Sequence, residues 1–188
     1  ISDPTAPTWN GGNIGAGIVF TTAPTAVKNF NGRAYWLVNP PTGQPSAIYS
    51  DILTGRVVTA ATQVLTFDDN KQLTALGNLG VGAILTGGIT QSLIVFKGTS
   101  GMVQVTGDAA SSTLAKNALS VPTGTLAPNS ICPTPKGLAF MSPEGMRIID
   151  FQTNVSDPIG IAGSGITVPF TYAAVPSRVA AACGGSIM

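Results

Sequence analysis

The side chains that could carry acid–base chemistry in this chain are its carboxylates, because the sequence contains no histidine. Without histidine there is no Ser–His or Cys–His nucleophile, no imidazole base and no imidazole metal ligand. The eight carboxylates are Asp3, Asp51, Asp68, Asp69, Asp108, Glu144, Asp150 and Asp157. A glycosidase needs two carboxyl groups facing each other across a cleft, and Asp51 with Asp150, or Glu144 with Asp150, could form such a pair.

Three of these acids are better explained by turns. Asp68, Asp69 and Glu144 fall in expected hairpin turns, where carboxylates bond to nearby backbone. The 68–70 cluster is too compact for a calcium loop. Thr113 and Lys116 have the spacing of a hydroxyl–lysine dyad, but a solvent-exposed pair on a helix is the simpler interpretation. We therefore expect no enzyme, and no catalytic, cofactor-binding or metal-binding residue.

Three further features need an interpretation: a serine between two glycines, a glycosylation sequon and a pair of aromatic residues. Ser164 lies between two glycines and is expected to be a turn serine without a base. Residues 154–156 (Asn-Val-Ser) form a glycosylation sequon, which matters only in a secreted eukaryotic protein. The aromatic residues Trp36 and Tyr49 could stack on sugars, although aromatic residues at alternating strand positions more often form core.

A sequence pattern that occurs twice predicts the strands that position these residues. Residues 92–105 and 137–149 each contain an apolar strand, a turn of small residues and a second strand. Leu93 aligns with Leu138 at an offset of 45 residues, and Met102 aligns with Met146. Residues 32–38 and 47–51 form a weaker third copy. Hairpins at this period are typical of β-propeller blades.

The length of the chain limits the number of propeller blades that it can form. The 188 residues are too few for a closed propeller of six or seven blades of about 45 residues each. We expect an all-β fold, a partial β-propeller of about three antiparallel blades. An irregular segment is expected over 1–25, followed by blades over 26–80, 81–125 and 126–165 and the start of another over 166–188. The beginning at Ile1 suggests a piece of a longer polypeptide.

Some local expectations are more specific. Residues 73–79 read better as a strand than as a helix, and residues 108–120 are the only convincing helix candidate, with Asp108 as its cap. Residues 154–165 are rich in turn formers and are expected to bridge two blades. No apolar run reaches 18 residues, so no transmembrane helix is expected.

The charge of the chain limits the partners that we expect, and its cysteine content bears on its compartment. Charged residues are 9% of the chain and the net charge is +1, with basic residues scattered singly. A protein that grips nucleic acid through its phosphates needs clustered cations. Cys132 and Cys183 are expected to be buried free thiols, and a single bridge in an oxidising compartment is the alternative.

Several phrases together resemble the tail hub proteins of short-tailed bacteriophages, also called nozzle or packaged-DNA stabilisation proteins. The phrases lie at 91–100, 105–108, 124–131 and 137–145, with 30–36 and 47–51 upstream, and the resemblance spans residues 26–160. It implies a propeller subunit that forms a ring below the portal, extends the tail tube and helps retain packaged DNA. It carries over no catalytic or ligand-binding residue.

The leading hypothesis is therefore a structural virion protein of the phage tail, assembled in the bacterial cytoplasm. Its expected partners are copies of itself, portal-adaptor or tail proteins, and packaged DNA that passes without sequence-specific binding. The alternative is a carbohydrate- or receptor-binding β-domain that uses Trp36 and Tyr49. A third hypothesis is a glycosidase fragment that uses Asp51, Glu144 and Asp150.

Overall fold

The fold is all-β, as the sequence predicts. The computed structural model describes residues 20, 22–53, 58, 62–80, 91–108 and 113–159. In this part of the chain the strands form three antiparallel sheets of three or four strands, and the helical content is one 3₁₀ turn, Pro128–Ser130. The chain divides into two compact units, Ile1–Asn70 and Lys71–Met188. No helix among the described residues is long and apolar enough to cross a membrane.

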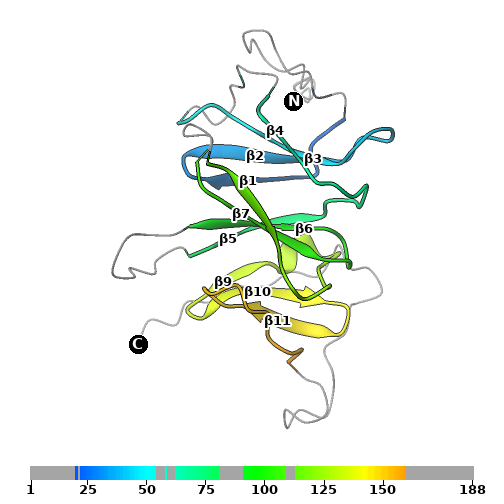
Figure 1. Cartoon of the computed structure of the whole chain (residues 1–188). Helices are drawn as coiled ribbons and strands as arrows, with labels where there is room; N and C mark the ends of the chain where they lie inside the picture. Colours follow the sequence, from blue (N-terminus) through cyan, green and yellow to red (C-terminus); the bar gives the residue numbers. More distant parts are fainter. Residues whose placement is uncertain are drawn as a thin grey trace, which may run out of the picture. The chain divides into compact units, whose positions relative to one another are not determined.

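The unit Ile1–Asn70 contains a four-stranded meander (Figure 1). Its strands are β1 (Ala26–Phe30), β2 (Arg33–Val38), β3 (Ser46–Tyr49) and β4 (Val64–Thr66), and each pairs with the next along the chain. Asn31 and Gly32 have φ values of 48° and 70°, the pair of positive angles that a tight type I′ hairpin needs. All six residues of β2 are buried, so both faces of this strand are covered.

The second meander consists of β5 (Ala75–Leu79), β6 (Ser92–Phe96), β7 (Met102–Thr106) and β8 (Ala115–Ala118), again in chain order. The strand predicted at 73–79 is confirmed over Ala75–Leu79. It pairs with β6, so this sheet begins at Ala75 and not at the expected boundary of 81. The expected segment boundary at 25 falls directly before β1, which begins at Ala26, and the boundary at 165 lies outside the described residues.

The helix expected over 108–120 is wrong for its described part. Ala115–Ala118 pair antiparallel with β7, from Thr106↔Ala115 to Val103↔Ala118. Gly107 turns the chain at φ 89°, and the Asp108 amide donates to Thr113 Oγ1 at 3.0 Å. The ladder to β7 satisfies the backbone as a helix would, and this tertiary pairing outweighs the helix propensity of alanine and lysine, since tertiary context routinely overrides intrinsic propensity.

The third sheet consists of β9 (Cys132–Thr134), β10 (Gly137–Ser142) and β11 (Gly145–Ile149). The chain then folds back along β11, with bridges Ile149↔Val155 and Met146↔Ile159. The Ser156 amide donates to Ile148 O at 2.8 Å and the Ile159 amide to Met146 O at 2.7 Å. Residues 154–159 are the described part of the expected connection between blades. They run antiparallel beside β11 without forming a regular strand.

The core of the unit Lys71–Met188 lies between its two sheets. Ile94, Phe96 and Met102 from one sheet pack with Leu138, Phe140 and Ile149 from the other. The rings of Phe96 and Phe140 lie 5.1 Å apart, inclined at 60°. In the other unit, Ala34, Trp36, Val38, Ile48 and Val58 form a separate cluster.

Cys132 is disulfide-bonded, and the expectation of a free thiol at this position is wrong. The sequence contains one other cysteine, Cys183, which lies outside the described residues. Oxidation of Cys132 is the alternative that the sequence left open, and such bonds persist in oxidising surroundings.

Candidate functional site

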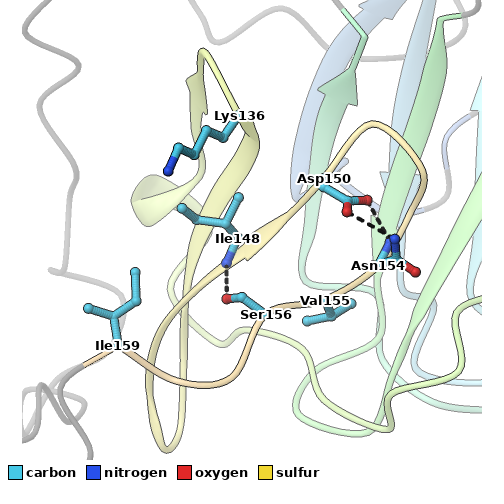
Figure 2. A pocket seen from close by; sticks show the side chains of 7 residues that line it. All are labelled: Lys136, Ile148, Asp150, Asn154, Val155, Ser156 and Ile159. Atoms are coloured by element: carbon cyan, nitrogen blue, oxygen red, sulfur yellow. Dashed lines mark hydrogen bonds between the residues drawn. The ribbon is translucent and has the colours of Figure 1, made fainter. Parts of the chain in front are cut away.

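A pocket of about 330 Å³ opens beside β11 in the unit Lys71–Met188 (Figure 2). Three elements supply its walls: the turn between β9 and β10, the strand β11, and the chain that folds back along it. The residues that line it are Lys136, Ile148, Asp150, Asn154, Val155, Ser156 and Ile159. Isoleucine and valine side chains give the pocket its apolar walls, and Lys136 and Asp150 are its charged residues.

Asp150 holds the loop that forms one side of the pocket. Its Oδ1 accepts hydrogen bonds from the backbone amides of Gln152 at 2.9 Å and Asn154 at 2.8 Å. Its Oδ2 accepts from Asn154 Nδ2 at 2.9 Å. Thr153, at the tip of this loop, has a φ of 68°. Both carboxylate oxygens thus serve the turn, which is a common role for aspartate at such positions.

The hydroxyl group of Ser156 also forms hydrogen bonds within the fold. Its hydroxyl accepts from the Ile148 amide at 3.0 Å and donates to Asp157 O at 2.9 Å. The exposed ammonium group of Lys136 and the apolar walls are what the pocket offers to another molecule. This arrangement suits binding of an apolar group with a nearby negative charge, and it provides no nucleophile with an adjacent base.

A polar network lies at the other end of β11. Arg147 donates to Glu144 Oε2 at 3.2 Å, to Ser142 Oγ at 3.2 Å and to Ser156 O at 2.9 Å. Ser142 also donates to Glu144 Oε2 at 3.1 Å. Burial raises the pKa of Glu144, but the hydrogen bonds from Ser142 and Arg147 outweigh that effect and leave the pKa below its usual value of 4.5. Glu144 therefore stays ionised and serves the hairpin turn.

The structure separates one of the two carboxylate pairs that a glycosidase would need. Glu144 precedes the five-residue strand β11 and Asp150 follows it, which places their backbones about 20 Å apart along the strand. Paired catalytic acids lie about 5–9.5 Å apart, so the Glu144–Asp150 pair is wrong. Asp51 belongs to the other unit, where its Oδ1 accepts from Gln63 Nε2 at 2.9 Å, and its pairing with Asp150 stays a prediction.

The proposed sugar platform is wrong for Trp36. This side chain is only 5% exposed and packs edge-on against Phe20, with ring centroids 5.7 Å apart. Tyr49 is half-buried, with its ring 5.5 Å from that of Tyr35 and 5.9 Å from the Arg33 guanidinium. The core interpretation of these aromatic residues is the one that the structure supports.

The remaining candidates do not assemble a site either. Thr113 Oγ1 bonds to the Asp108 backbone, and Lys116 lies on the exposed strand β8. Within the described ranges no three histidine, cysteine or acidic residues gather as metal ligands would. Ser164 lies outside those ranges. Asn154 of the sequon is exposed, and its amide group bonds to Asp150.

Sequence reasoning singled out Asp150 and Asn154 but missed Lys136 and the apolar walls. The pocket exists because the chain folds back on β11 after residue 150, and no local pattern signals that return. The chain matches no protein-family model, no curated protein and no solved structure.

Proposed function

We propose that this chain is a structural virion protein, part of the tail hub or nozzle ring of a short-tailed bacteriophage. In this role it connects to the portal and helps to retain and channel packaged DNA. The observation that carries the proposal is the succession of three antiparallel meanders along the chain, each with its strands in chain order. Successive meanders of this kind are the building plan of propeller blades.

The packing within the unit Lys71–Met188 supports the same plan. Its two sheets bury a shared apolar layer that includes Phe96 and Phe140. Neighbouring propeller blades bury their faces against each other in this way. In the proposal these sheets are two blades of a partial propeller, and the meander β1–β4 is a third.

The chemistry of the described side chains supports a scaffold better than a catalyst. The carboxylates of Asp150, Glu144 and Asp51 are each engaged by neighbouring hydrogen-bond donors. Lys28 on β1, Lys116 on β8 and Lys136 in the turn between β9 and β10 are exposed and lie far apart along the chain. Dispersed cations suit a surface along which DNA passes, because tight phosphate binding needs clustered ones.

The test is assembly of the full reading frame that contains this chain. We expect light scattering to give a discrete oligomer and negative-stain electron microscopy to show rings with a central channel. A protein that stays monomeric at tens of micromolar would overturn the proposal. Antibodies against the chain should also label the tail end of purified short-tailed particles that carry this gene.

A further inference from the structure

An exposed apolar tip projects from the unit Ile1–Asn70. It consists of Ile52, 49% exposed, and Leu53, 86% exposed, immediately after Asp51. Leu53 has a φ of 59°, a left-handed conformation that costs a leucine roughly 1–2 kcal/mol. Strain of this kind persists where the surrounding structure enforces it, and it is often found where a protein meets a ligand or partner.

Hydrogen bonds hold the apolar tip in place. The Leu53 amide donates to Gly32 O at 2.7 Å, which ties it to the β1–β2 turn. Arg33, only 7% exposed, donates to Ser50 O at 2.8 Å. Gln63 fixes Asp51, as described above. These hydrogen bonds tie the backbone of the tip to the sheet, so less ordering entropy would be lost when it binds.

The pocket beside β11 has the complementary chemistry. Its volume of about 330 Å³ is ample for two aliphatic side chains, since a cavity of about 150 Å³ holds a benzene molecule. Its apolar walls come from Ile148, Val155 and Ile159, and its exposed cation is Lys136. The carboxylate of Asp150, which also lines the pocket, already accepts three hydrogen bonds from its own loop. The size and polarity of the apolar tip therefore suit the pocket, and Asp51, which precedes the tip, supplies a negative charge for Lys136.

We propose that the apolar tip of one copy of this chain docks into the pocket beside β11 of a second copy. The proposal rests on the ring assembly proposed above and names the contact that would build it. A contact between two different parts of the chain, the apolar tip in one unit and the pocket in the other, is heterologous, and such a contact generates a ring when the rotation between copies closes. Asp51 and Lys136 would pair at the rim of this contact.

The sharpest variant is Leu53→Gly, in the full reading frame. Glycine accepts the left-handed φ without strain, so the thermal midpoint should stay the same or rise. The loss of the apolar side chain should raise the concentration for half-assembly by about 10- to 30-fold. Lys136→Glu and Ile159→Arg, at the pocket, should weaken assembly as well. Val27→Thr and Lys28→Glu are matched controls on the exposed β1 and should leave assembly unchanged.

A cross-link identifies the two partners. Copies carrying Leu53→Cys, mixed with copies carrying Val155→Cys, should form a covalent dimer under mild oxidation, and neither variant alone should do so. A chain that carries both cysteines and closes an internal bond at nanomolar concentration would overturn the contact between copies.

The outcomes separate the two proposals. If the wild-type protein forms rings and the tip and pocket variants assemble equally well, this contact is wrong and the ring proposal stands. If the wild-type protein does not assemble, the ring proposal falls and this contact falls with it.

Discussion

Gly77 of β5 lies directly against Leu138 of β10. A β-carbon added to Gly77 would approach Leu138 Cδ2 to 2.4 Å and Ile131 Cγ2 to 3.0 Å. Leu138 is only 1% exposed and belongs to the shared core, so it has little room to move aside. The close approach of the two sheets at this point thus depends on the absence of a side chain on β5.

This relationship predicts that Gly77→Ala lowers the free energy of unfolding by about 1–3 kcal/mol, the usual cost of overpacking a core. Urea denaturation measures the change. Leu138→Ala alone should cost about 2–5 kcal/mol, and the double variant should cost less than the sum, because each change relieves the other. Strict additivity would contradict the contact.

Replacement of Trp36 should affect stability and not sugar binding. Because the indole is buried against Phe20, Trp36→Ala should lower the free energy of unfolding by about 3–5 kcal/mol, measured by thermal or urea denaturation. The milder Trp36→Phe keeps an aromatic ring and serves as the comparison. Saturable glycan binding by the wild-type protein that disappears in a folded Trp36→Phe variant would restore the carbohydrate-binding alternative.

The network around Glu144 predicts a small pH dependence. Because the folded state lowers the pKa of Glu144, its stabilisation is fully present above the unfolded value of about 4.5 and is lost as the pH falls through the folded value. Glu144 is 51% exposed, so solvent screening limits the effect to about 0.5 kcal/mol.

Unfolding free energies of the wild type and Glu144→Gln, compared at pH 7 and pH 3 in low salt, test this prediction. The wild type should be slightly more stable than Glu144→Gln at pH 7, and this difference should be smaller at pH 3. If the variant is as stable as the wild type at pH 7, the hydrogen bonds of Glu144 contribute nothing to stability.

The disulfide at Cys132 predicts that the oxidised protein carries no thiol that reacts with iodoacetamide when unfolded, whereas the reduced protein carries two. Intact-mass spectrometry counts the adducts. Reduction should lower the free energy of unfolding by about 2–4 kcal/mol, and Cys132→Ala should lower it similarly. Two adducts on protein unfolded without a reductant would show that Cys132 is not bonded.

The hairpins were predictable because their signals are local. Apolar runs joined by small turn residues mark β6–β7 and β10–β11. The Asn31–Gly32 pair was not used to predict the turn between β1 and β2, although such a pair is a local signal of a tight hairpin. The turn roles of Glu144 and Asp150 follow from the same local chemistry, since each carboxylate bonds to groups within a few residues of itself.

The sequence by itself determined the all-β class, the hairpins and the absence of histidine chemistry, because these depend on residue type and on spacing over a few positions. Only the tertiary structure decided that Ala115–Ala118 add to a sheet, that residues 154–159 return along β11, and that Cys132 is oxidised. Each of these depends on backbone or sulfur partners far along the chain, and no short stretch of sequence specifies such partners. The pocket and the exposed Leu53 belong to this second group, because burial and exposure are properties of the packed chain.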